Sequence, residues 1–305
     1  MDPFNVHKLK IKQGFNDMSE SIRYNKVIDL LESGQTVFAS GLIWNGNIDD
    51  LMFVADSDYD MVMLEMEHEG FNLDSLRLSL QFLLNRKRIV EQGNVQADVV
   101  PLVRIPPNAR ELSQWIIKQA LDTGVYGIVI PHLNTVEEAK AAVVAARYPQ
   151  VPGVPDFEPQ GERGWWQRIA PRYWGITPQE YYDAADLWPL DPRGNMLLMG
   201  IIEEPAGVEN LRDILREVKG IGAIWAGPGD MSISMGLRGN AGHADVQKNL
   251  LRILEACKEF NVPCATGANN PDEVRMRIDQ GFRIIITSPQ TVTPGLAEGR
   301  RLTNR

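Results

Sequence analysis

Short apolar runs alternate with amphipathic segments along almost the whole 305-residue chain. The apolar runs, each typical of a buried strand, span residues 36–42, 61–64, 99–103, 127–130, 196–202, 223–226, 262–265 and 283–287. The segments between them that have helical spacing span residues 49–56, 73–85, 109–123, 135–147, 207–218, 244–260 and 271–280. Apolar runs that do not alternate with polar residues, and that are separated by helices, indicate a parallel sheet covered on both faces.

Eight strand–helix units predict a closed (β/α)8 barrel, a fold that typically needs about 250 residues. The alternative, an open dinucleotide-binding sheet, lacks its glycine fingerprint because no GxGxxG follows the first run. We therefore expect a single barrel domain over residues 1–305, with an N-terminal extension at 1–24. An insertion at about 148–195 is rich in proline and aromatic residues. A segment of this length is expected to act as a lid, as an oligomer contact or as packing.

Composition narrows the possible partners and location of the protein. The net charge of −9 argues against nucleic acid, whose phosphates require a basic face. No apolar stretch approaches the ~18 residues of a membrane span, and the first residues lack the apolar centre of a signal peptide. The two cysteines, Cys257 and Cys264, do not form a CxxC pair. We therefore expect a cytoplasmic protein that binds neither nucleic acid nor membrane.

Polar residues follow several of the predicted strands, where a parallel barrel places its active site. They are Glu65, Glu67 and His68 after the second run, Arg104 after the third, His132 after the fourth, Glu203 and Glu204 after the fifth, and Asp230 after the sixth. No lysine stands at these strand ends, so Schiff-base chemistry would lack its amine. Two acids on successive strands, Glu203 and Asp230, predict a site for a hard divalent cation.

Each of these residues also has a structural interpretation. Glu203 would suit the first turn of the following helix, and Asp230 would suit a turn after Gly-Pro-Gly. His68 is compatible with a hydrogen-bonded loop, and Arg104 with an ion pair to a nearby acid. His132 is the weakest candidate, for which a structural role is expected. The convergence of the other four on one rim favours a functional site.

The chain resembles the class II, metal-dependent pyruvate aldolases of the HpcH/HpaI family, which includes the 4-hydroxy-2-oxoheptanedioate aldolases of aromatic degradation. The motifs that carry the resemblance are Glu67-His68, Val-Arg-Ile-Pro around Arg104, Glu203 before a helix, and Gly-Pro-Gly-Asp-Met-Ser at 227–232. The resemblance extends over residues 25–301. It implies a (β/α)8 barrel assembled as a homohexamer, with the C-terminal helix exchanged between subunits. It also implies Mg²⁺, Mn²⁺ or Co²⁺ held by Glu203 and Asp230.

The resemblance further implies reversible aldol cleavage of a 4-hydroxy-2-oxo acid to pyruvate and an aldehyde. Arg104 would stabilise the enolate, His68 would take the proton of the 4-hydroxyl, and Glu65 would hold the His68 ring. Backbone amides at Gly229 and Asp230 would receive the pyruvate carboxylate.

The chain departs from the family pattern at three positions. It has Glu65 where the family usually has aspartate, Met66 in place of glycine, and Ile201 in place of glutamine. These departures leave the identity of the aldehyde open.

Three other functions remain open. Oxaloacetate decarboxylation, or a carbon–carbon coupling like that of macrophomate synthase, would use the same enolate and give His132 and the insertion more weight. A CoA-ester lyase of the citrate-lyase type shares the barrel but would need a basic surface for the nucleotide phosphates. A non-catalytic protein that binds a metal or a 2-oxo acid is the third possibility.

Overall fold

The computed structural model describes residues 23–44, 46–107, 114–166, 168–287 and 292–305. Its strands are β1 (Val37–Trp44), β2 (Met61–Glu65), β3 (Val100–Arg104), β4 (Gly127–Ile130), β5 (Leu187–Trp188), β6 (Met196–Ile202), β7 (Ala223–Ala226), β8 (Cys264–Gly267) and β9 (Ile284–Thr287). Its helices are α1 (Lys26–Glu32), α2 (Ile48–Ala55), α3 (Leu73–Phe82), α4 (Arg86–Gln92), α5 (Trp115–Leu121), α6 (Val136–Ala146), α7 (Ala170–Trp174), α8 (Pro178–Ala184), α9 (Pro205–Glu217), α10 (Pro228–Ser234), α11 (Ala244–Glu259), α12 (Pro271–Gln280) and α13 (Val292–Thr303). Most of the predicted N-terminal extension lies outside the described residues.

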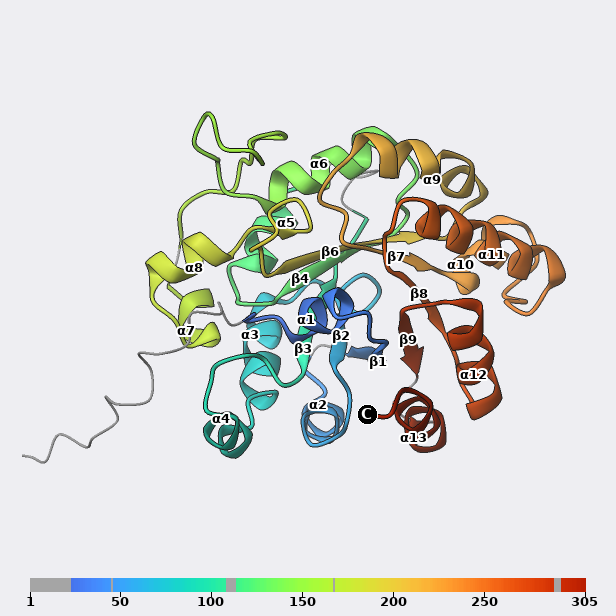
Figure 1. The fold of residues 1–305 in the computed structure, drawn as a ribbon, viewed down its shortest axis with the longest axis horizontal. Helices are drawn as coiled ribbons and strands as arrows, with labels where there is room; N and C mark the ends of the chain where they lie inside the picture. The colour runs from blue at the N-terminus through green and yellow to red at the C-terminus, as the bar shows by residue number, and fades with distance from the viewer. Residues whose placement is uncertain (1–22, 45, 108–113, 167, 288–291) are drawn as a thin grey trace, which may run out of the picture.

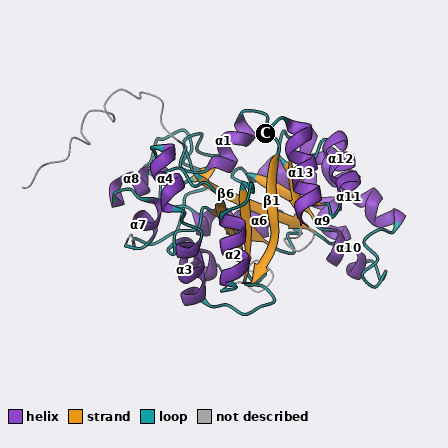
Figure 2. Ribbon diagram, turned by 90° about the horizontal axis from the view of Figure 1, so that it is seen from below, coloured by secondary structure: helices purple, strands orange, loops and turns teal. Residues whose placement is uncertain are grey.

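Eight parallel strands close into a barrel, which confirms the predicted fold. The strands follow the order β4-β3-β2-β1-β9-β8-β7-β6, and pairing between β4 and β6 closes the ring. The helices surround the strands (Figures 1 and 2). The short β5 lies outside the ring and pairs only with β6 among the described strands. Because all eight barrel strands run in the same direction, their carboxyl ends meet at one rim.

The apolar runs predict the barrel strands closely, whereas the helix boundaries depend on capping residues. The predicted helix at 73–85 corresponds to α3, and an additional helix, α4, follows it because the Asn85 side chain accepts a hydrogen bond from the Arg88 amide. In contrast, α6 begins as predicted, with Thr135 and Glu138 forming a capping box. The predicted helix at 109–123 lies partly outside the described residues, and α5 begins at Trp115.

The aromatic insertion packs at the amino ends of the strands. It contains α7, α8 and β5, and Trp174 stacks on Tyr126 with ring centroids 4.2 Å apart and planes 2° apart. Tyr181 meets Trp174 edge to face at 4.9 Å. Tyr126 directly precedes β4, so this cluster lies at the opposite end of the barrel from the predicted site. The predicted lid is therefore wrong for these aromatic residues, and the packing interpretation holds for them.

The C-terminal helix α13 packs against its own barrel and lies beside α12 (Figure 1). Buried Asp60 forms ion pairs with Arg300 at 3.0 Å and with Arg305 at 2.7 Å. A Cβ at Gly299 would lie 2.2 Å from the Phe38 ring, so this close approach requires glycine. In the single chain this helix packs on its own barrel, and its exchange between subunits stays a prediction. None of the helices in the described ranges is long and apolar enough to span a bilayer.

Candidate active site and metal centre

The strands deliver the predicted residues to one rim. Glu65 and Arg104 are the last residues of β2 and β3 and stand in register with each other. Glu203 follows β6, and Asp230 lies in the first turn of α10, just after β7. The strands themselves are apolar and buried, so the polar residues that end or follow them lie at the rim formed by their carboxyl ends.

Glu65 and Arg104 form a buried ion pair. Arg104 donates from Nε to Glu65 Oε2 at 2.8 Å, and its Nη2 contacts the same oxygen. Its Nη1 lies 3.1 Å from Oε2 of Glu67, so the guanidinium is held between two carboxylates. A guanidinium has five N–H groups, so these contacts leave donors for a ligand. The structural and the functional interpretations of Arg104 are therefore compatible.

The structure corrects the expected partner of the His68 ring. Glu65 accepts hydrogen bonds from the backbone amides of Glu67 at 2.6 Å and His68 at 3.1 Å, and it does not hold the imidazole. The His68 Nε2 instead lies 3.5 Å from Oε2 of Glu67, and 61% of the side chain is exposed. Glu65 therefore shapes the loop, while Glu67 contacts the ring. His68 itself stands at the open mouth of the site.

His132 lies closer to the centre of the site than its sequence context predicts. Its backbone amide donates to Glu203 Oε1 at 2.8 Å, and its Nδ1 lies 2.7 Å from Glu204 Oε1. Its Nε2 lies 3.6 Å from Glu67 Oε1. The backbone adopts a left-handed conformation with φ of 53°, which is uncommon outside glycine. The signal in the sequence was its place directly after a strand, in Ile-Pro-His.

Glu203 is a buried carboxyl group surrounded by other acids. Burial, together with the charges of Asp230 and Glu67, raises the pKa of Glu203 to about 8, although the His132 amide and the charge of Arg104 oppose this shift. Burial also raises the pKa of Glu67, although Arg104 and both neighbouring histidines oppose this shift. Negative charge at this rim is thus incompletely compensated by the described residues, which favours binding of a cation.

The geometry around Glu203 and Asp230 fits a hard divalent cation. A Cβ at Gly227 would lie 2.9 Å from Ile201 Cγ2 and 3.2 Å from Glu203 Oε2, so a larger residue there would crowd the carboxylate. At Gly229 a Cβ would meet no atom within 4 Å, so the approach beside Asp230 is open. Two carboxylates with room for further oxygen ligands suit Mg²⁺ or Mn²⁺ better than a closed nitrogen and sulfur site.

The sequence profile of the HpcH/HpaI aldolase/citrate lyase family matches residues 43–290, which is most of the chain. The chain belongs to this family. A 5-keto-4-deoxy-D-glucarate aldolase from Salmonella arizonae is 30% identical over 227 residues, which cover 74% of this chain and 76% of that protein. The chain is therefore a carbon–carbon lyase of the metal-dependent aldolase class.

Solved structures also share the fold of this HpcH/HpaI family member. A family protein from Burkholderia cenocepacia J2315 superposes with a TM-score of 0.70 at 22% identity, covering 91% of this chain and 97% of that chain. Macrophomate synthase superposes with a TM-score of 0.62 at 25% identity, covering 92% of this chain and 86% of that chain. The barrel is thus common to proteins with different named activities.

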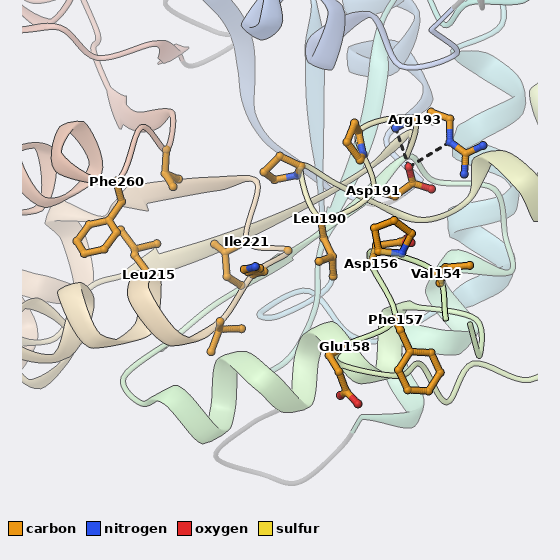
Figure 3. A pocket seen from close by; sticks show the side chains of 17 residues that line it. Val154, Asp156, Phe157, Glu158, Leu190, Asp191, Arg193, Leu215, Ile221 and Phe260 are labelled. Carbon is orange, nitrogen blue, oxygen red and sulfur yellow. Dashed lines mark hydrogen bonds and ion pairs between the residues drawn. The ribbon is translucent and has the colours of Figure 1, made fainter. Parts of the chain in front are cut away.

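A cavity of about 1010 Å³ lies at the opposite end of the barrel (Figure 3). Its lining includes Ile221, which precedes β7, and Leu215 and Phe260, near the ends of α9 and α11. The size of this cavity does not make it the catalytic site of the HpcH/HpaI family member, because Arg104, Glu203 and Asp230 lie at the other rim, where a parallel barrel places its active site.

Three carboxylates near this cavity come within 4.8 Å of one another: Asp156, Asp186 and Asp191. They are already paired with cationic or N–H groups. Arg147 Nη2 lies 3.2 Å from Asp156 and 2.6 Å from Asp186, and the Arg193 amide donates to Asp191 at 2.8 Å. These pairings give the three carboxylates a structural role.

Proposed function

We propose that the protein cleaves a 4-hydroxy-2-oxo acid to pyruvate and an aldehyde, and catalyses the reverse addition, with a divalent cation at Glu203 and Asp230. The observation that carries this proposal is the buried Glu203 carboxyl beside Asp230, with a pKa raised to about 8 and Arg104 close by. A bound Mg²⁺, Mn²⁺ or Co²⁺ would act as a Lewis acid on the 2-oxo group. The identity of the cation is open.

Arg104 is proposed to stabilise the negative charge that develops on the 2-oxo oxygen. Its ion pairs with Glu65 and Glu67 fix the plane of the guanidinium, so no reorganisation is needed as charge develops. Lysine would supply a single point charge in place of the planar fork. We expect Arg104→Lys to lower kcat/KM by about 100-fold, with the melting temperature as a control for folding. Near-normal turnover would make Arg104 a structural residue.

His68 is proposed as the general base that takes the proton of the 4-hydroxyl group. Its exposed ring stands at the mouth, where the C4 end of a substrate would lie, and Glu67 contacts it at 3.5 Å. Histidine is the most frequent residue in this role. The backbone amides of Gly229 and Asp230 are proposed to bind the pyruvate carboxylate, supported by the open approach at Gly229.

The test is pyruvate release from 4-hydroxy-2-oxoheptanedioate, measured with coupled lactate dehydrogenase. We expect the His68→Ala variant to lose at least about 100-fold in kcat while binding Mn²⁺ with unchanged affinity in calorimetry. The exposed His243→Ala variant, at the start of α11, is the matched control and should behave as wild type. A His68→Ala variant with full turnover would contradict the assignment of the base.

A second candidate is reaction of the same enolate with a partner other than an aldehyde, as in oxaloacetate decarboxylation or a coupling like that of macrophomate synthase. The central position of His132, between Glu67 and Glu204, favours keeping this candidate. Oxaloacetate and 4-hydroxy-2-oxoheptanedioate should be compared as substrates under identical conditions. A higher kcat/KM for the hydroxy-oxo acid supports the aldolase, and a higher value for oxaloacetate supports the decarboxylase.

We further propose that residues 1–305 form one domain and that the protein acts in the cytoplasm as a homo-oligomer, specifically a hexamer. Support for a reducing compartment comes from Cys257 and Cys264, which are both free thiols. Light scattering coupled to size exclusion should give six times the monomer mass of 34.2 kDa. A monomer would contradict the oligomer.

A further inference from the structure

An exposed tryptophan stands at the end of the strand that pairs with the Glu65 strand. Trp44 is the last residue of β1, and 63% of it is exposed. It stands in parallel register with Glu65, and Glu65 stands in register with Arg104. Side chains of paired residues in a sheet lie on the same face. Trp44 therefore projects from the face of the sheet that carries Glu65 and Arg104, at the rim where His68 lies.

Two more aromatic residues line the same rim. Phe71 lies three residues after His68, directly before the Asn72 cap of α3, and Trp115 begins α5, which follows β3. Their rings meet edge to face, with centroids 5.7 Å apart and planes 84° apart. Half of Trp115 is exposed. Helices that follow barrel strands start at the carboxyl ends of those strands, so this pair belongs to the catalytic end.

Trp44, Phe71 and Trp115, which we call the aromatic mouth, thus lie at or after the ends of β1, β2 and β3, three neighbouring strands. The aromatic cluster of the insertion is different, because Trp174 and Tyr181 are buried at the opposite end. Exposed aromatic side chains that gather at the entrance of a site generally mark a binding surface.

We propose that this aromatic mouth binds the aldehyde, and that the preferred acceptor is an aromatic aldehyde. The proposal rests on the proposed aldolase function and names its second substrate class. Aromatic rings gain from stacked or edge-to-face contact beyond the burial of apolar area. His68 lies three residues before Phe71 in the same loop, so the proposed base is then close to the carbonyl carbon of such an acceptor.

The corresponding cleavage substrate is a 4-aryl-4-hydroxy-2-oxo acid. The C4 hydroxyl loses its proton to the base, the C3–C4 bond breaks, and C4 becomes the carbon of the aryl aldehyde. The electron pair of the broken bond passes to the pyruvate enolate, which is then protonated at C3. The proton taken from the hydroxyl balances the proton gained at C3, so the reaction needs no oxidant or reductant.

The experiment measures addition of pyruvate to benzaldehyde and to glycolaldehyde, with Mn²⁺ present, by chromatography of the hydroxy-oxo acid product. Wild type should show a higher kcat/KM for benzaldehyde. Trp44→Ala should lower the value for benzaldehyde about tenfold and change that for glycolaldehyde less than about twofold. Trp44→Phe should restore most of the benzaldehyde activity.

Phe53→Ala is the matched control, because Phe53 is half exposed on α2, away from the strand ends. It should leave both acceptors unchanged. Equal losses for both aldehydes in Trp44→Ala would overturn the proposal, as would a change of molar mass in light scattering, which would make Trp44 a subunit contact. Wild-type activity confined to glycolaldehyde would also overturn it while leaving the aldolase intact. Failure with every aldehyde and every hydroxy-oxo acid would instead contradict the proposed function.

Discussion

At the scale of single residues, the carboxyl groups of the site have different neighbours. Glu65 is tied to Arg104 and two backbone amides, whereas Glu203 is buried beside Asp230 and Glu67. Glu65 thus holds the Arg104 guanidinium in place. The acids around Glu203 instead favour binding of a metal cation from solution. Two glutamates at equivalent strand ends thus serve different purposes.

The raised pKa of Glu203 predicts that the free energy of unfolding depends on pH. Its pKa is about 8 in the folded chain, against 4.5 for an exposed glutamate. Between these values the unfolded chain ionises while folded Glu203 keeps its proton, so the free energy of unfolding should fall as pH rises. The slope for one proton is at most about 1.4 kcal/mol per pH unit. Urea unfolding with chelator at pH 5, 6.5 and 8 should show this fall in wild type and a smaller one in Glu203→Gln. Identical slopes would refute the assignment.

The contact between the His132 amide and Glu203 predicts that the backbone conformation of His132 positions Glu203 more than its imidazole does. The residue donates its amide to Glu203 Oε1 from a left-handed backbone. Glycine adopts this conformation freely, whereas a β-branched residue is strained there. His132→Gly should therefore keep Mn²⁺ affinity within about threefold, and His132→Val should weaken it at least about tenfold. Calorimetric titration checks both variants, and equal affinities would show that the amide does not position Glu203.

At the scale of elements, the strands could be predicted from the sequence and several helices could not. Buried strands such as β4, β6 and β7 are apolar runs with sharp ends, so their bounds match the predicted ranges. The helices α4, α7 and α8 were missed because they are short, and the starts of α4 and α8 depend on capping by Asn85 and Thr177. Short helices carry too few turns to show a period.

The candidate site could be predicted only in part, for a related reason. Position at a strand end located Glu203, Asp230, Arg104 and His68 at one rim. Pairing between side chains was not predictable, because Glu65 and Glu67 lie only two residues apart and the conformation of the loop decides which of them meets the ring. The sequence therefore predicted the set of residues but assigned the His68 ring to Glu65, whereas the structure places it against Glu67.

Helix α13 depends on one buried acid. Burial by itself raises the pKa of Asp60, but the charges of Arg300 and Lys26, together with the Phe38 amide and the Arg305 hydrogen bond, outweigh it and hold the pKa below its usual value. Its stabilising effect is therefore complete above pH 4 and lost as pH falls through the folded pKa.

Asp60→Asn should lower the free energy of unfolding at pH 7 by roughly 3 kcal/mol, since breaking a buried pair leaves charges uncompensated. Exposed Asp58→Asn is the matched control and should change it by less than about 0.5 kcal/mol. Thermal unfolding of both variants provides the measurement. Equal melting temperatures for Asp60→Asn and wild type would show that α13 is held by other contacts.

At the scale of the whole molecule, the candidate site and the aromatic insertion lie at opposite ends of the barrel. The rim formed by the carboxyl ends carries the acids, Arg104 and the aromatic mouth. The opposite end carries the insertion, with its stacked Trp174 and Tyr126, and the large cavity (Figure 3). A parallel barrel permits this division because loops at the two ends vary independently. The membership of the chain in an aldolase family is consistent with a site at the first end.

The most direct test of the central claim is the metal dependence of pyruvate release at Glu203 and Asp230. The enzyme is stripped with chelator, and pyruvate formation from 4-hydroxy-2-oxoheptanedioate is followed with and without added Mn²⁺ or Mg²⁺. Wild type should be inactive when stripped and recover on addition of the cation, whereas Glu203→Gln and Asp230→Asn should remain at least about 100-fold slower at saturating metal. Full turnover by the stripped enzyme, or by either variant, would contradict the account.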